Sequence, residues 1–156
     1  MITTQPTLYV LVGLPASGKS TWAEQQRFEN TVHVNTDKHV EAYANQVGKT
    51  YSEVFNEYMP QAIGLMMHEV REAVREGKNI IWDQTSTTVA SRQRKFYYTS
   101  QYKKVAVIFK VSDPDEHKRR LASRPGKEIP IDVIAQMSEQ WEEPTLEEGF
   151  DEIWNT

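Results

Sequence analysis

One stretch of the chain combines glycine, lysine and hydroxyl residues at a spacing suited to holding phosphate. Residues 13–21 match the pattern G-x-x-x-x-G-K-[ST] of phosphate-binding loops. In such a loop glycine lets backbone N–H groups approach a polyphosphate, and the next helix presents its N-terminal N–H groups to the anion. Lysine adds charge near the β- and γ-phosphates, and the following hydroxyl holds Mg²⁺. The residues predicted to bind the nucleotide are Gly13, Pro15, Ala16, Ser17, Gly18, Lys19, Ser20 and Thr21.

The sequence on either side of this loop supports the match. An apolar run over residues 8–12 has the length of a buried parallel strand, and residues 20–27 have the pattern of a helix. A strand, a glycine loop and a helix in this order are the setting that a phosphate-binding loop requires. We therefore expect ATP or another nucleoside triphosphate with Mg²⁺, with Lys19 catalytic and Ser20 a ligand of the metal.

Two acidic residues follow the next predicted strands. Asp37 comes directly after a short strand at residues 32–35, and Asp83 ends an apolar strand at residues 79–83. Ligands of open parallel sheets bind at the carboxyl ends of the strands. Asp37 is thus a candidate general base that takes the proton of an acceptor hydroxyl, with a helix N-cap as the alternative. Asp83 is a candidate to hold Mg²⁺ or to grip the acceptor, with a turn-forming role as the alternative.

Two arginines in the second half of the chain could serve the transferring phosphoryl group. Arg120 and Arg124 are four residues apart, which would place them on one helix face. Arginine over the phosphates stabilises charge in the transition state. The break at Pro125-Gly126 makes a mobile lid over about residues 113–129 plausible. The alternative is a solvated basic face.

The remaining elements alternate between strands and helices, which predicts an α/β fold with a mostly parallel sheet of about five strands between helical layers. Proline at position 60 is expected to kink or divide the longest helical pattern. We expect one domain over residues 1–156. The predicted helices are 38–46, 51–76, 91–101, 113–123 and 130–141, and the further strands are 104–111 and 150–154.

Composition excludes several classes of protein. The chain has no cysteine, which excludes thiol catalysis, disulfides and thiolate metal sites and is compatible with a cytoplasmic location. Residues 1–7 lack the features of a signal peptide, and no apolar run has the length of a membrane span. The net charge of −4 argues against non-specific coating of nucleic acid. Four histidines, His33, His39, His68 and His117, lack metal-ligand spacing, and His33 is expected to pack or face solvent.

Five segments resemble the P-loop polynucleotide 5′-hydroxyl kinases and the small phage and bacterial ATPases related to them. GLPASGKSTW at 13–22 looks like the family's phosphate loop, and VHVNTD at 32–37 looks like its H-V-N-R-D segment, whose Asp is the general base. DQTSTTVASRQRK at 83–95 is similar to its acceptor-facing D-N-T-N…S-R-x-R segment. Residues 120–137 resemble its lid and the following helix, and residues 144–153 resemble the end of its kinase domain.

This resemblance implies an adenylate-kinase-like P-loop fold and transfer of the γ-phosphate of ATP to the 5′-hydroxyl end of DNA or RNA. It implies that Asp37 is the base, that Arg124 and Arg120 cover the phosphoryl group, and that Asp83, Thr85 and Arg92 orient the acceptor. Some relatives are fused to a phosphatase or a ligase. The length of this chain leaves room for neither, so end repair would need such partners in trans.

Two departures leave the acceptor open. Thr36 replaces the family's Arg before the base, and D-N-T-N has become Asp83-Gln84-Thr85-Ser86, with Gln84 and Ser86 in place of its two Asn residues. A kinase acting on a nucleoside, another small molecule or a hydroxymethylated DNA base is therefore an alternative. A nucleotide-dependent switch ATPase is another, and it would need no acceptor base. A binding module without catalysis fits less well with the negative net charge and the intact Lys19-Ser20 pair. The sequence indicates no oligomeric state.

Overall fold

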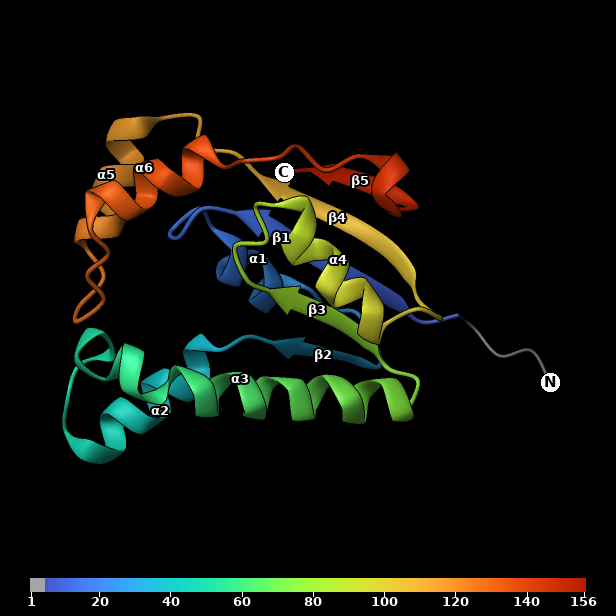
Figure 1. Cartoon of the computed structure of the whole chain (residues 1–156), viewed down its shortest axis with the longest axis horizontal. Helices are drawn as coiled ribbons and strands as arrows, with labels where there is room; N and C mark the ends of the chain where they lie inside the picture. The colour runs from blue at the N-terminus through green and yellow to red at the C-terminus, as the bar shows by residue number, and fades with distance from the viewer. Residues whose placement is uncertain (1–4) are drawn as a thin grey trace.

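The computed structural model describes residues 5–156, so the part of the signal-peptide prediction that concerns residues 1–4 lies outside it. Strands and helices alternate along the described chain (Figure 1). The strands are β1 (Thr7–Gly13), β2 (Thr31–Val34), β3 (Asn79–Asp83), β4 (Lys103–Phe109) and β5 (Glu152–Asn155). The helices are α1 (Lys19–Gln25), α2 (Asp37–Val47), α3 (Tyr51–Arg75), α4 (Val89–Tyr98), α5 (Pro114–Ala122), α6 (Ile131–Glu139) and the 3₁₀ turn η1 (Leu146–Glu148).

All five strands run parallel in the order β2-β3-β1-β4-β5, which confirms the predicted α/β class and its parallel sheet. β1 lies at the centre, with Val10 opposite Trp82 of β3 and Ala106 of β4. Its carboxyl end is therefore flanked by the carboxyl ends of both neighbours. That end carries the predicted phosphate loop.

Each face of the sheet has its own apolar core, because successive side chains of a strand point to opposite faces. Leu8 and Val10 of β1 pack on one face with residues of α3 and α4, such as Met66 and Phe96. Leu11 packs on the other face with Ala23 of α1 and residues of β4. The sheet is thus covered on both sides, which is the predicted three-layer sandwich.

The long helix α3 corrects one prediction. Pro60 lies inside it, yet the helix runs without interruption from Tyr51 to Arg75. A proline removes one intrahelical hydrogen bond at a cost of about 3 kcal/mol. Buried residues on both sides of Pro60, Val54 and Ala62, pack into the same cluster with α2, and this shared packing keeps the helix in one piece.

Several elements gather beyond the carboxyl ends of the strands. Figure 1 shows α5 and α6 at the same end of the sheet as α2 and the beginning of α3, with the connection between α5 and α6 reaching toward α3. These elements enclose the region around the phosphate loop. None of the helices among residues 5–156 is long and apolar enough to cross a membrane.

Candidate active site

The phosphate loop lies between the end of β1 at Gly13 and the start of α1 at Lys19. Gly18, the N-cap of α1, has a φ of 101°, a conformation that favours glycine. A Cβ atom at Gly13 would lie 2.5 Å from Ser17 Oγ and 2.9 Å from Phe109 Cβ, so only glycine fits there. Glycine is therefore required at position 13 because the loop packs closely on itself and on β4.

Lys19 is almost completely buried, with 8% of its surface exposed. Its Nζ donates a hydrogen bond to the carbonyl oxygen of Leu14 at 2.8 Å. Burial lowers the pKa of Lys19 to about 8, although the carboxylates of Asp83 and Asp37 oppose the change. A buried ammonium group that donates to an uncharged carbonyl oxygen can form a stronger, charge-assisted hydrogen bond with an anionic ligand.

Ser20 and Asp83 meet at the predicted metal position. Ser20 Oγ donates to Asp83 Oδ2 at 2.7 Å, and His33 Nε2 lies 2.8 Å from the same oxygen. Burial raises the pKa of Asp83, but the hydrogen bonds from His33 and Ser20 and the charge of Lys19 outweigh it and hold this pKa below its usual value. A hydroxyl and an ionised carboxylate are hard oxygen ligands of the kind that Mg²⁺ prefers, so the donor set fits this ion.

Asp37 is the first residue of α2, and Thr36 occupies the N-cap position. The side chain that caps this helix belongs to Asn35, whose Oδ1 accepts from the backbone N–H of Lys38 at 3.0 Å. The alternative interpretation of Asp37 as the N-cap is therefore wrong. Its Oδ1 instead accepts a hydrogen bond from the hydroxyl of Tyr51 at 2.6 Å.

One pocket of about 810 Å³ at the carboxyl end of the sheet is lined by Lys19, Ser20, Asp37, Tyr51 and Asp83. Arg124 also lines it, and its Nη1 is buried without a hydrogen-bond partner among residues 5–156. A buried guanidinium nitrogen without an acceptor fits an anionic ligand that would supply one. The predicted site residues that line this pocket are Pro15, Ala16, Gly18, Lys19, Ser20, Thr21, Asp37, Asp83, Thr85 and Arg124.

Arg120 lies apart from Arg124. Helix α5 ends at Ala122, so the two arginines do not share a helix face as predicted. The residue before a proline is disfavoured in helical conformation, and Arg124 precedes Pro125. Arg120 instead contacts Glu116 at 3.4 Å and lines a smaller depression beside Ala16 and Ser17.

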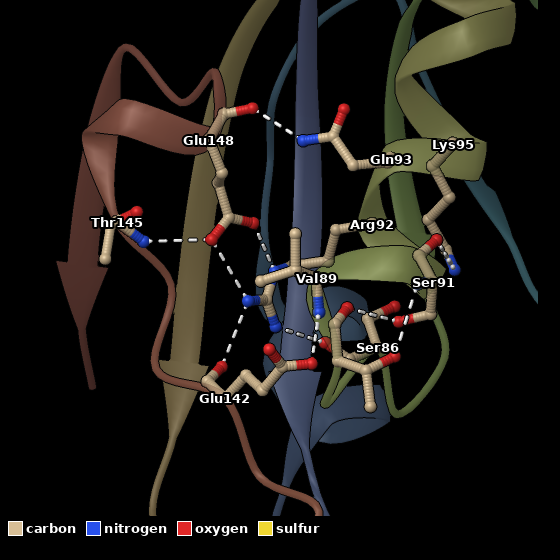
Figure 2. Close-up of polar contacts among 10 residues, drawn as sticks. Ser86, Val89, Ser91, Arg92, Gln93, Lys95, Glu142, Thr145 and Glu148 are labelled. Carbon is tan, nitrogen blue, oxygen red and sulfur yellow. Dashed lines mark hydrogen bonds and ion pairs between the residues drawn. The ribbon is translucent and has the colours of Figure 1, made fainter.

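Arg92 does not line the pocket, and the prediction that it orients the acceptor is wrong. Its side chain is fully buried and forms an ion pair with Glu148. Figure 2 shows its guanidinium between Glu148 and the backbone oxygens of Ser86 and Glu142, at 2.9 Å and 3.0 Å. Arg92 therefore ties the loop after β3 to the C-terminal segment. That loop also fixes the start of the phosphate loop, since the backbone carbonyl oxygen of Thr85 accepts a hydrogen bond from the N–H of Gly13 at 2.9 Å.

Several residues at the site were missed by the sequence reasoning. His33 contacts Asp83 rather than only packing, and His117 Nε2 lies 2.7 Å from the carbonyl oxygen of Pro15. Tyr51 touches the predicted base. The one usable signal for His33 was its alternation with Val32 and Val34, which places it on the face opposite theirs, but nothing in the sequence named its partner.

The comparisons with known proteins identify a family. The model of a family described as AAA domain (AAA_33) matches residues 8–144 of this chain. A chain of the Pnkp1/Rnl/Hen1 RNA repair complex is 25% identical, with a TM-score of 0.68. The match covers 89% of this chain but 45% of that one, so the present chain spans less than half of its length.

Two other solved structures share the fold. A candidate kinase from Chloroflexus aurantiacus is 19% identical with a TM-score of 0.69, and the match covers 99% of this chain and 86% of that one. A shikimate kinase from Bacteroides thetaiotaomicron is 20% identical with a TM-score of 0.53, covering 96% and 86%. The predicted P-loop kinase fold is thereby confirmed.

Proposed function

This chain belongs to the AAA domain family AAA_33 and has a P-loop kinase fold, and from that premise we propose that it transfers the γ-phosphate of ATP to the 5′-hydroxyl end of DNA or RNA. The observation that carries the proposal is that Lys19, Asp37 and Arg124 line a single pocket, beside the Ser20–Asp83 pair. This set contains the parts that phosphoryl transfer to an alcohol requires, namely cations for the phosphates and a base for the acceptor.

In the proposed mechanism the loop backbone and Lys19 hold the β- and γ-phosphates. Ser20 and Asp83 would hold Mg²⁺, which would neutralise charge on the phosphate oxygens. Asp37 takes the proton from the acceptor hydroxyl. The oxygen of that hydroxyl attacks the γ-phosphorus in line with the departing ADP. Arg124 donates to the phosphoryl oxygens, and its buried Nη1 finds its acceptor there.

The proposed mechanism also involves a lid within a single kinase domain. We treat residues 1–156 as one kinase domain, with residues 113–129 as the lid that carries Arg124 over the phosphates. Arg120 has a place in transfer only if the lid moves, since it faces a different depression in this structure. Closure of such a lid would exclude water, which competes with the acceptor hydroxyl for the phosphoryl group.

The choice of a nucleic-acid end rests on two lines of support. The family segments at 32–37 and 83–95 resemble those of polynucleotide kinases, and the fold is similar to a chain of an RNA repair complex. End repair also needs a phosphatase or a ligase, and we propose that such partners act in trans.

A second candidate acceptor is a small molecule, and the composition of the pocket wall favours it. Opposite the phosphate loop, Phe55 and Met59 of α3 face the pocket together with Val133 and Met137 of α6. The cations that line the pocket are Lys19, Arg124 and Lys127, and Lys127 is paired with Glu41. An apolar wall with few cations suits a nucleoside or a hydroxymethylated base better than a long polyanionic strand.

One experiment separates these acceptors. Purified protein is incubated with γ-labelled ATP, Mg²⁺ and one acceptor at a time, with Lys19→Ala as the inactive control. The acceptors are 5′-hydroxyl DNA and RNA oligonucleotides, the same strands carrying 5′-phosphates, free nucleosides, and DNA with hydroxymethylated bases.

Label on the 5′-hydroxyl strands alone is the expected result. Label that ignores the 5′ end, or that appears only on nucleosides or modified bases, would replace the nucleic-acid end by the second candidate. Release of free phosphate without a labelled acceptor would instead indicate a switch ATPase.

A further inference from the structure

The first observation concerns how Tyr51 is placed at the site. Tyr51 is the first residue of α3, directly after the N-cap Thr50, whose side chain and that of Glu53 form a capping box. This box fixes the backbone of the first helical turn. The Tyr51 hydroxyl reaches Asp37 Oδ1 at 2.6 Å, and both side chains line the pocket. A residue of α3 thus holds the carboxylate that we assign as the base on α2.

The second observation is that the connection between α5 and α6 holds the same turn of α3. The N–H of Ser52 donates to the carbonyl oxygen of Gly126 at 2.9 Å, and the N–H of Glu128 donates to Ser52 Oγ at 2.7 Å. Between them, Lys127 places its Nζ 4.8 Å from the centre of the Tyr51 ring and forms an ion pair with Glu41 of α2. The lid segment therefore contacts Tyr51 and both helices that carry the Asp37–Tyr51 pair.

We propose that Tyr51 is a positioning residue for phosphoryl transfer, which orients the Asp37 carboxylate toward the acceptor and is held in place by Lys127 of the lid segment. The inference rests on the proposed function, because it needs Asp37 to act as the base. With Oδ1 engaged by Tyr51, the other carboxylate oxygen has a fixed direction from which to accept the proton of the acceptor hydroxyl. Removing the contact between Lys127 and Tyr51 would loosen this geometry.

The chemistry of Tyr51 is consistent with a donor that keeps its proton. Burial, followed by the charge of Asp37 and the hydrogen bond to it, raises the pKa of Tyr51 well above its usual value. The charged residues near the pair come from the phosphate loop, α2 and the lid segment, and they are Lys19, Glu41, Arg124 and Lys127. Tyr51 therefore donates to Asp37 and does not compete with it as a base.

The chain offers a matched control in a second tyrosine–carboxylate bond between the same helices. Tyr43 of α2 donates to Glu57 of α3 at 3.2 Å, and neither residue lines the pocket. Tyr51→Phe and Tyr43→Phe each remove one hydroxyl from the α2–α3 interface and leave the ring. If the Tyr51 hydroxyl contributed only to the packing of α2 against α3, the two variants would have the same kcat.

The test measures kcat and KM for ATP and for the acceptor that the labelling experiment identifies. Thermal unfolding serves as a check on folding. Tyr51→Phe is expected to lower kcat about tenfold with KM for ATP unchanged, which is the effect of losing a hydrogen bond to a charged group. Tyr43→Phe is expected to leave kcat unchanged. Lys127→Met should also lower kcat. Lys127→Arg should keep the wild-type kcat, because arginine retains a cation over the Tyr51 ring.

The outcomes distinguish this inference from the proposed function. A folded Tyr51→Phe variant with the kcat of Tyr43→Phe would overturn the positioning role alone. Full additivity of Tyr51→Phe and Lys127→Met in kcat would refute the part of Lys127, since two residues acting through one geometry are not additive. A wild-type protein that phosphorylates no hydroxyl acceptor would overturn the proposed function and this inference with it.

Discussion

The ammonium group of Lys19 donates a hydrogen bond to the carbonyl oxygen of Leu14 at 2.8 Å, so this lysine contacts the backbone of its own loop. The carbonyl offers no full negative charge, and burial lowers the pKa of Lys19 to about 8 even with Asp83 and Asp37 nearby. Binding of a polyphosphate adds the negative charge that favours the protonated form. Nucleotide binding and protonation of Lys19 should therefore be linked.

We predict that ATP binding takes up a proton at about pH 8.5, where Lys19 of the ligand-free protein is partly neutral. Titration calorimetry in two buffers of different ionisation enthalpy measures this uptake. Lys19→Arg should bind ATP without uptake, because arginine stays charged. Lys95→Met should keep the uptake: burial also lowers the pKa of Lys95 to about 8, but this lysine does not line the pocket. Equal heats in both buffers for the wild-type protein would contradict the linkage.

Lys19 also affects stability as a function of pH, with a definite sign. The folded chain releases this proton near pH 8, whereas the unfolded chain keeps it up to about 10.5. The unfolded state binds more protons in this window, so the contribution of Lys19 to stability rises with pH between these values.

Asp37→Asn separates the base from a structural role. We expect ATP affinity to stay within about twofold, while transfer falls by about 10² to 10⁴, the range for loss of a general base. The amide oxygen can still accept from Tyr51, so the fold and the α2–α3 contact should persist. Equilibrium binding of ATP and single-turnover transfer measure the two effects. A normal transfer rate would show that another group takes the proton.

The Arg92–Glu148 pair provides a prediction about stability. Arg92→Met leaves the carboxylate of Glu148 buried beside an apolar side chain, which should cost about 3–5 kcal/mol in the free energy of unfolding. The matched control is Lys103→Met, because the Lys103–Glu152 pair is exposed and should contribute little to the free energy of unfolding. Urea unfolding measures both. Similar losses for the two variants would argue against a structural role for the buried pair.

Glycine substitutions test the packing of the phosphate loop. A Cβ at Gly13 would collide with Ser17 Oγ and Phe109 Cβ, so Gly13→Ala should shift the loop and weaken ATP binding about tenfold or more. Gly64 lies inside α3 with nothing within 4 Å of the added atom. Gly64→Ala should leave binding unchanged and raise stability by about 0.5–1 kcal/mol. Binding titrations and thermal unfolding test the pair, and unchanged affinity of Gly13→Ala would show that the loop tolerates the clash.

The parts of the fold that could be predicted from sequence are those with local signals. The strand before Gly13 and the strand ending at Asp83 are short apolar runs beside turn residues, and both lie where predicted. The division of α3 at Pro60 was predicted wrongly. The free-energy cost of a proline inside the helix is outweighed by the packing of α3 against α2, which involves residues elsewhere in the chain. Local propensity decides an element only where tertiary contacts do not oppose it.

The site was predictable to the extent that its residues lie at or shortly after the ends of strands. Asp83 ends β3, and Asp37 and Lys19 begin the helices that follow β2 and β1; all three line the pocket. An arginine that binds the acceptor and an arginine in a buried ion pair look alike in the sequence. The burial of Arg92 depends on its ion pair with Glu148, which lies 56 positions later. Such a partner, like the tyrosine that contacts Asp37, is chosen by the three-dimensional course of the chain and leaves no mark at the residue itself.

The central position of β1 has a consequence for synthesis of the chain on the ribosome. Its two neighbours are β3 and β4, so β1 has no partner in the sheet until residues 79–83 emerge, and its second edge is paired only when residues 103–109 follow. Pairing between segments so distant in sequence is slow to form. The nascent chain therefore carries an apolar, unpaired strand until residues 79–83 emerge, and both strands that flank the nucleotide loop are in place only after residue 109. Chaperone dependence should consequently be concentrated before residue 109 is released.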